Sequence, residues 1–226
     1  MKVNNSLEET IDAYGDDHVG SSATTPLRAD AFELSNPKKV ELIQEKVAEI
    51  LEILGMDLTD DSIKGTPNRV AKMYVNEIFG GLHPDKKPKA STFSNKYKYG
   101  EILVEKNITL YSTCEHHLLP IVGKAHVAYI SKGTVVGLSK MNRIVQYYAQ
   151  RPQVQERLTI QIVEELKQVL GTADVACVID AKHLCVNSRG IRDISSSTIT
   201  SEFGGAFKNK ETKREFLDYI QLDTEF

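Results

Sequence analysis

The chain has 226 residues, three cysteines and a net charge of −3, so it is long enough to bury a core in one large domain or two small ones. The near-neutral charge argues against a dedicated nucleic-acid-binding protein, and no apolar run approaches the ~18 residues of a membrane span. The odd cysteine count argues against a disulfide scaffold, and the lack of an apolar signal-peptide core after Met1 predicts a cytoplasmic protein.

The first part of the chain is predicted to be a flexible arm followed by a helical region. Residues 1–35 are polar and lack periodicity, as expected of an arm. A helix is expected over residues 36–55, because an Asn or Ser cap and an early proline precede apolar residues at helical spacing. A second helix is expected over residues 66–80, and a Lys/Pro-rich linker then completes an N-terminal helical region over residues 36–85.

Residues 86–226 are predicted to form an α+β unit. Its expected elements are strands over residues 102–105, 108–111 and 125–130, helices over 139–150 and 152–171, strands over 173–186 and 189–201, and a closing helix over 211–220. Ser139 is the expected cap of the first of these helices, and Pro152 is expected to open the second. The β-β-α-α-β-β order indicates an antiparallel sheet covered by helices on one face.

The strongest chemical signal is the motif Cys114-Glu115-His116-His117, with His183 and Cys185 downstream. Thiolate and imidazole together are the ligands that zinc selects. Because Cys114 and His117 are three positions apart, both can reach one ion only where the chain turns. On a strand, His183 and Cys185 would project from the same face.

The simplest metal site built from these residues uses three ligands. The ligands would be Cys114, His117 and Cys185, with His116 and His183 beside the ion. Three protein ligands leave one coordination position for water, which is the pattern of a catalytic zinc site. Two alternatives stay open, no metal at all and a structural site whose fourth ligand is His116, His183 or Cys177. Cys177 fits poorly as that fourth ligand, because it lies in an apolar run where a free cysteine is usually a core residue.

A candidate anion site follows at a predicted helix start. Ser139 would cap the helix, and Lys140 and Arg143 lie three positions apart on one helix face. Free backbone N–H groups, the positive end of the helix dipole and two cations suit a polyphosphate. Arg189 and Arg69 could join this cluster if the fold or a neighbouring subunit brings them near. The alternative is a solvated basic helix face.

A candidate base-recognition site lies at Gln155-Glu156, in the early turns of the next predicted helix. The helix dipole keeps a carboxylate ionised there. An ionised Glu156 could accept two parallel N–H bonds from the N1–H and 2-amino edge of guanine, and adenine offers no such pair. The alternative is a glutamate that only interacts favourably with the helix dipole.

Five stretches in register resemble GTP cyclohydrolase I of the zinc-dependent type, over about residues 38–220. The stretches are Gly65–Tyr74 (GTPNRVAKMY), Ser112–His117 (STCEHH), Val136–Lys140 (VGLSK), Gln150–Thr159 (QRPQVQERLT) and Cys185–Gly190 (CVNSRG). The resemblance implies the tunnelling fold, or T-fold, preceded by a helical part. It also implies a homodecamer of two stacked pentamers, with sites formed between subunits. The implied reaction converts GTP to 7,8-dihydroneopterin triphosphate and formate, the first step towards tetrahydrofolate and other pterins.

The resemblance also implies a role for each candidate residue. The zinc ligands would be Cys114, His117 and Cys185; the catalytic residues His116, His183 and Ser139; the triphosphate contacts Lys140, Arg143, Arg189 and, from an adjacent subunit, Arg69; and the guanine contacts Glu156 with Gln155. We expect His183 to protonate ring nitrogen 7, so that water can attack carbon 8. We expect His116 to act at the ribose ring oxygen, with Ser139 relaying a proton.

Two other functions compete with this interpretation. A different T-fold enzyme, such as a reductase acting on a pterin or deazaguanine, would share a base-binding glutamate but should lack the complete three-ligand metal set. A non-catalytic nucleotide-binding or structural zinc module would instead fill all four coordination positions with protein ligands.

Overall fold

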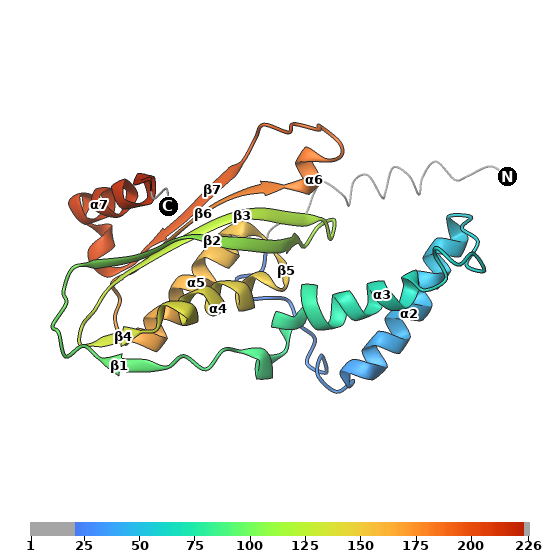
Figure 1. Cartoon of the computed structure of the whole chain (residues 1–226), viewed down its shortest axis with the longest axis horizontal. Coiled ribbons are helices and arrows are strands. Elements are labelled where there is room, and N and C mark those ends of the chain that lie inside the picture. Colours follow the sequence, from blue (N-terminus) through green and yellow to red (C-terminus); the bar gives the residue numbers. More distant parts are fainter. Residues whose placement is uncertain (1–20, 224–226) are drawn as a thin grey trace.

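The computed structural model describes residues 21–223 of the chain and has a mixed α+β fold (Figure 1). The first 20 residues of the predicted arm lie outside this range, and residues 21–35 contain turns but no helix or strand. Two helices, α2 (Asn36–Ile53) and α3 (Thr66–Met73), pack against each other beside the sheet and its helices. Among the described residues, no helix combines the length and apolar character needed to cross a membrane.

Both N-terminal helices begin where the sequence predicts, and α2 also ends near the predicted Gly55, whereas α3 ends at Met73, before the predicted glycine pair. The Ser35 side chain caps α2 by accepting a hydrogen bond from the Lys38 backbone N–H, and Gly55 follows the helix with φ +81°. After α3 the chain continues through a π-helical turn (Tyr74–Ile78) and the 3₁₀ turns Gly80–Leu82 and Pro84–Lys86.

Gly81 joins this helical region to the rest of the chain. Its backbone N–H donates to the Gln150 carbonyl at 3.0 Å, and a Cβ atom at Gly81 would lie 2.0 Å from the Tyr147 carbonyl oxygen. Only glycine permits so close an approach of the two backbones. The glycine pair that was predicted to end a helix therefore also forms a packing contact.

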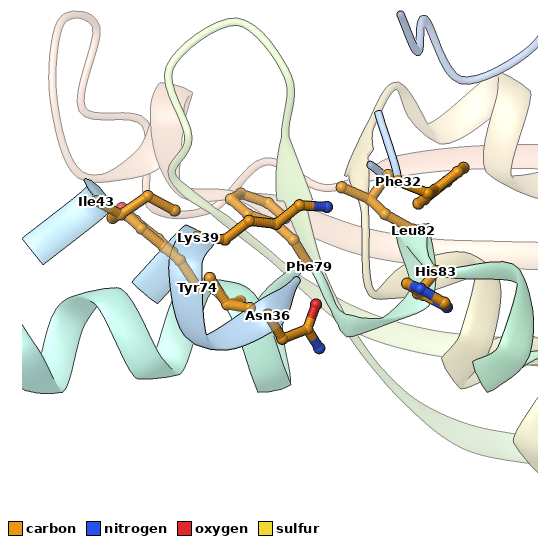
Figure 2. A pocket seen from close by; sticks show the side chains of 9 residues that line it. Phe32, Asn36, Lys39, Ile43, Tyr74, Phe79, Leu82 and His83 are labelled. Atoms are coloured by element: carbon orange, nitrogen blue, oxygen red, sulfur yellow. The ribbon is translucent and has the colours of Figure 1, made fainter. Parts of the chain in front are cut away.

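A small hollow lies between the start of α2 and the turns that follow α3 (Figure 2). Its volume is about 140 Å³, and the stacked rings of Tyr74 and Phe79 form part of its wall. Lys39 donates to the Ala31 carbonyl at 2.7 Å and places its ammonium 5.5 Å from the centre of the Phe32 ring. None of the candidate site residues lines this hollow, so we attribute it to packing of the helical region.

The main sheet has five strands in the order β5-β2-β3-β6-β7. The strands are β2 (Ile102–Cys114), β3 (Pro120–Ile130), β5 (Pro152–Gln153), β6 (Val175–His183) and β7 (Thr198–Phe203). All neighbours are antiparallel except β5 and β2, which are parallel. Two short strands that the sequence did not predict, β1 (Thr92–Ser94) and β4 (Thr134–Val136), pair separately.

Helices lie on both faces of this sheet, whereas the sequence predicted one covered face. Helices α4 (Leu138–Ala149) and α5 (Gln155–Leu170) pack on the face that carries Val127, Cys177 and Ile179. The closing helix α7 (Lys210–Gln221) and the 3₁₀ turn Gly205–Lys208 pack on alternate residues of the same strands, which point to the opposite face. Cys177 is fully buried in the core, as predicted.

Four further predicted element boundaries were wrong. Gly137 and not Ser139 is the N-cap of α4, and no side chain caps that helix. Pro152 pairs with β2 as part of β5, so α5 begins only at Gln155. The strand predicted to reach Val186 ends at His183, and a short helix, α6 (Leu184–Asn187), follows.

The last wrong boundary is the strand predicted over residues 189–201, which begins only at Thr198. Gly190 and Arg192 have φ of +58° and +55°, which interrupts an extended chain. The Asp193 carboxylate also accepts hydrogen bonds from the backbone N–H groups of Ser195 and Ser196, which stabilises a turn there.

A buried histidine supports an irregularity in β2. The ladder between β2 and β3 shifts between Glu105 and Ile108, and Asn107 in this bulge has φ +59°. The Asn107 backbone N–H donates to Nδ1 of His126, which is 6% exposed on β3. Burial lowers the pKa of His126, and the nearby charge of Lys124 adds to this effect.

We predict that this histidine makes stability fall in acid. Because the pKa of His126 is lower in the folded chain than its ordinary 6.5, the unfolded chain binds the proton first. The stabilising effect is therefore complete above about pH 6.5 and is lost as the pH falls towards the lower folded value. Chemical denaturation of wild type and His126→Asn, which keeps an acceptor near the Nδ1 position, should give a smaller acid-induced loss of unfolding free energy for the variant. Equal losses would contradict this role of His126.

Candidate metal centre and its cavity

The predicted turn in the Cys114-Glu115-His116-His117 motif is present at the end of β2. The Leu118 backbone N–H donates to the Cys114 carbonyl at 2.9 Å, and the Cys114 N–H donates to the Leu119 carbonyl at 2.8 Å. Leu118 has φ +52°, a left-handed conformation that reverses the chain. This turn brings His117 back beside Cys114, which two residues three positions apart need in order to reach one ion.

Cys185 approaches the same point from the other side. The strand β6 ends at His183, and Cys185 lies in the short helix α6 that follows, not on the strand. The possible ligand atoms of Cys114, His117 and Cys185 all lie within 4.8 Å of one another. Tetrahedral ligands at roughly 2.3 Å from zinc are ~3.7 Å apart, so small side-chain adjustments would let these three atoms share one ion. The donor set fits zinc.

The two thiols in this cluster have opposite pKa shifts. Burial opposes ionisation of Cys114, but hydrogen bonds from the His183 side chain, the backbone of His116 and His117 and the Cys185 thiol together lower its pKa to about 5. Burial and the neighbouring Cys114 sulfur raise the pKa of Cys185. These opposite shifts favour ionisation of Cys114 before Cys185. A divalent metal ion would favour the thiolate form of both sulfurs.

A cavity of about 500 Å³ opens beside the cluster. The candidate residues that line it are Cys114, His116, Gln155, Glu156, His183 and Cys185. His116 is exposed, with Nδ1 3.7 Å from the Cys114 sulfur. Glu156 is exposed in the first turn of α5, and Gln155 is buried and hydrogen-bonded to His183 at 2.8 Å. One cavity is therefore lined by thiol, imidazole and carboxylate groups.

An ion pair that the sequence analysis missed holds in place the turn that carries Cys114 and His117. Glu115, between two candidate ligands, pairs with Arg157 of α5, whose side chain is 3% exposed. Arg157 Nε donates to Gln153 Oε1 at 2.9 Å, Nη2 donates to the Pro152 carbonyl at 3.1 Å, and Nη1 donates to the Ser22 carbonyl at 3.2 Å. The Glu115 backbone N–H also donates to the Gln153 carbonyl at 3.0 Å. No spacing rule links residues 42 positions apart, so the sequence held no signal for this pair.

The predicted cations do not line the cavity within one chain. Ser139, Lys140 and Arg143 lie near the start of α4, where Asn142 donates to the Glu105 carboxylate at 3.2 Å. Glu105 and Cys114 are nine positions apart on β2, roughly 30 Å along a strand. The start of α4 and the metal cluster are therefore at opposite ends of the sheet (Figure 1).

Two further predicted cations are exposed outside the cavity lining. Arg69 lies on α3, where its guanidinium donates to Thr66 Oγ1 at 3.1 Å. Arg189 follows α6, and its charge acts on the Cys185 thiol, so it lies on the cluster side of the molecule.

Comparison with known proteins identifies one family. The sequence profile of the family described as GTP cyclohydrolase I matches residues 43–221. A protein named GTP cyclohydrolase 1 from Flavobacterium johnsoniae is 73% identical over 224 residues, covering 99% of this chain and 100% of that relative. Relatives of the same name from Klebsiella pneumoniae and Salmonella arizonae are 52% and 51% identical, over 90% and 96% of this chain and 92% and 98% of their own lengths.

We predict that Arg157→Met destabilises both the fold and the metal site. The variant leaves Glu115 without its cation, and breaking a buried ion pair costs about 3–5 kcal/mol. Zinc affinity should fall roughly 10- to 100-fold, as it does when groups that orient metal ligands are lost. Denaturant unfolding and chelator competition measure the two effects.

Arg214→Met on α7 is the matched control for this experiment. Arg214 is 85% exposed and lies 4.0 Å from Asp218, so its loss should cost less than about 1 kcal/mol and leave zinc affinity unchanged. Arg157→Met behaving like this control would rule out the role of the Glu115–Arg157 pair.

Proposed function

The chain belongs to the GTP cyclohydrolase I family, and we propose that it acts on GTP in the cavity beside Cys114, His117 and Cys185. The activity of this family serves pterin and folate biosynthesis. One observation carries the assignment of the site. Three side chains suited to zinc, an imidazole and an exposed carboxylate at a helix start come together around one cavity.

We propose zinc as the metal and a catalytic role for it. Its ligands would be Cys114, His117 and Cys185, and among the described residues these three form the group that can share an ion. Cys177 is buried in the core, and burial raises its pKa, so it does not suit a fourth ligand. Because the group among the described residues has three members, it favours a site that keeps one position for water over a closed structural site, and the presence of all three ligands argues against a T-fold reductase. When bound, zinc supplies the Lewis acid that makes water nucleophilic near neutral pH.

Glu156 is proposed to recognise the guanine base. Its carboxylate lies in the first turn of α5 and lines the cavity, where the helix dipole favours the ionised form. Two carboxylate oxygens can accept the N1–H and 2-amino hydrogens of guanine together. This contact would hold the imidazole ring of the base over the metal-binding cluster and would disfavour adenine.

The two histidines at the cavity are proposed to move protons. His183 would donate a proton to ring nitrogen 7, which makes carbon 8 electrophilic to water. Two hydrolytic attacks at carbon 8 then break its bonds to nitrogen and release formate. His116 would assist opening of the ribose, with Ser139 as a relay, before the rearranged chain closes the pterin ring and expels water. The balance is one GTP and one water giving 7,8-dihydroneopterin triphosphate and formate.

The triphosphate is proposed to bind between subunits. Lys140 and Arg143, with Ser139, are separated from the metal cluster by most of the length of β2, which is longer than an extended nucleotide. A neighbouring copy that placed the start of its α4 against this cavity would supply these cations. Arg189 lies on the cluster side of the same chain, and Arg69 would come from an adjacent copy.

The larger assembly is also a proposal. The strand and helix order between β2 and β7 fits the T-fold, in which edge strands join neighbouring subunits. We propose a homodecamer of two stacked pentamers, and a division of each chain into an arm to residue 35, a helical region to residue 85 and a catalytic T-fold domain.

We predict that Cys185→Ser loses both bound zinc and formate release. A hydroxyl is a weaker zinc ligand than a thiolate, so zinc content should fall and the formation of fluorescent pterin from GTP should drop at least ~100-fold. Cys177→Ala removes a thiol from the core instead and should keep both zinc and turnover. A Cys185→Ser enzyme that turned over GTP at the wild-type rate would exclude this ligand set.

A further inference from the structure

We propose that Gln155 is a positioning residue that fixes the ring of His183, and that its side chain does not contact the guanine base. The proposal rests on the function proposed above and changes the role expected for Gln155 from its place beside Glu156. Four hydrogen bonds surround the buried amide of Gln155, and they give this residue a different task from its neighbour Glu156 at the start of α5.

The amide nitrogen of Gln155 faces groups that can only accept hydrogen bonds. Nε2 lies 2.8 Å from the Thr198 carbonyl oxygen and 3.2 Å from the Ile179 carbonyl oxygen. Turning the amide over would place the acceptor Oε1 against these two acceptor oxygens, which is costly because Gln155 is 1% exposed. The backbone of β6 and β7 therefore determines the orientation of this amide.

A chain of hydroxyl groups fixes the same orientation independently. Thr159 Oγ1 donates to the Gln155 carbonyl at 2.8 Å, so its own hydrogen is already used. In the 2.7 Å contact between Thr159 Oγ1 and Thr200 Oγ1, Thr200 must then be the donor. Thr200 Oγ1 is left to accept from Gln155 Nε2, which lies 3.1 Å away. The two hydroxyl hydrogens each have one acceptor, so this arrangement places Nε2 and not Oε1 of Gln155 beside Thr200.

The orientation of the amide determines which ring nitrogen of His183 carries the hydrogen of their shared bond. Gln155 Oε1 lies 2.8 Å from His183 Nε2 and can only accept, so the hydrogen of this bond belongs to His183 Nε2. Nδ1 is then the ring nitrogen left for the contact with the Cys114 sulfur and for the substrate. The same bond sets the plane of the ring at the wall of the cavity. Gln155 thus acts on the reaction through His183.

Consecutive helix residues point in different directions, which separates Gln155 from Glu156. The side chain of Gln155 turns into the sheet and satisfies its polar atoms on β6 and β7, whereas Glu156 is exposed at the cavity. Glu156 is therefore free to bind a base. The Gln155 amide has no unused donor with which to bind it as well.

Steady-state kinetics with GTP test this division of roles. Gln155→Met keeps the side-chain length but removes both ends of the amide; we expect kcat to fall roughly 10- to 100-fold while KM changes less than about 3-fold. Glu156→Ala should instead raise KM for GTP. Gln168→Met, at an exposed position of the same helix, is the matched control and should match wild type. A Gln155→Met enzyme with a raised KM and an unchanged kcat would overturn the proposal in favour of a direct base contact.

A double-mutant cycle shows whether Gln155 acts through His183. In a His183→Ala background, Gln155→Met should lower kcat by less than about 2-fold, because the group that it positions is gone. If Gln155→Met lowered kcat as much in the His183→Ala background as in the wild type, the proposal would be overturned. Zinc content of every variant should stay at the wild-type level, which separates this effect from damage to the metal site.

NMR of nitrogen-labelled histidine provides a readout that needs no turnover. The His183 signal, identified by its loss in His183→Ala, should report hydrogen on Nε2 in the wild type and a mixture of ring forms in Gln155→Met. Absence of hydrogen from Nε2 in the wild type, or no change in the variant, would contradict the proposal. If the wild-type protein formed no pterin from GTP, the proposed function would fail while this NMR result could still stand.

Thr200→Val tests whether disturbed packing, and not the lost bond to His183, causes the fall in kcat of Gln155→Met. It removes one partner of the amide but leaves the bond between Gln155 and His183, so kcat should stay within about 3-fold of wild type. A loss as large as that of Gln155→Met would mean that packing around β7, and not the histidine, produces the effect, and would overturn the proposal.

Discussion

The pairing of β3 with both β2 and β6 is the constraint on which the rest of the site depends. Thr113 pairs with Pro120, and Ile121 pairs with His183, so the last residues of β2 and of β6 lie side by side at one end of the sheet. A Cβ atom at Gly123 would lie 2.1 Å from the Asp180 carbonyl oxygen, so only glycine allows β3 and β6 to approach so closely there. A slip of one residue would turn the side chains of β6 to the other face and separate the two cysteines.

The first turn of α5 places three side chains with different roles at this end of the sheet. Gln155 bonds to the backbone of two strands and to His183, Glu156 is exposed to the cavity, and Arg157 holds the turn that carries Cys114 and His117. These residues are consecutive, so one helix start reaches the histidine, the proposed base-binding position and the metal-binding turn. Its position follows from β5, which pairs with β2 beside Cys114 and directs the chain into the helix.

The part of the candidate metal site that depends on short spacing could be predicted from the sequence. Cys114 and His117 lie within four residues, and the turn that joins them is a local structure. The mixed α+β fold followed from apolar periodicity for the same reason. The role of Cys177 as a core residue also followed from its apolar neighbours.

The remaining features depend on contacts between distant residues. The acceptors of Gln155 on β6 and β7 are 24 and 43 positions away, and the partner of Arg157 is 42 positions away. Periodicity carries no information about such pairs. The strand that was expected to carry Cys185 ends early because the chain enters α6. The predicted cations near Ser139 are at the other end of the sheet, so one chain is not sufficient to build the proposed triphosphate site.

The central claim is that two sulfurs and one imidazole hold an ion that keeps one position for solvent. X-ray absorption spectroscopy of the zinc-loaded protein tests it most directly. We predict two sulfur neighbours and one imidazole nitrogen, together with one light atom whose signal is that of solvent and not of a second imidazole. A shell filled by four protein ligands, or a metal-free protein that converts GTP at the full rate, would contradict the account.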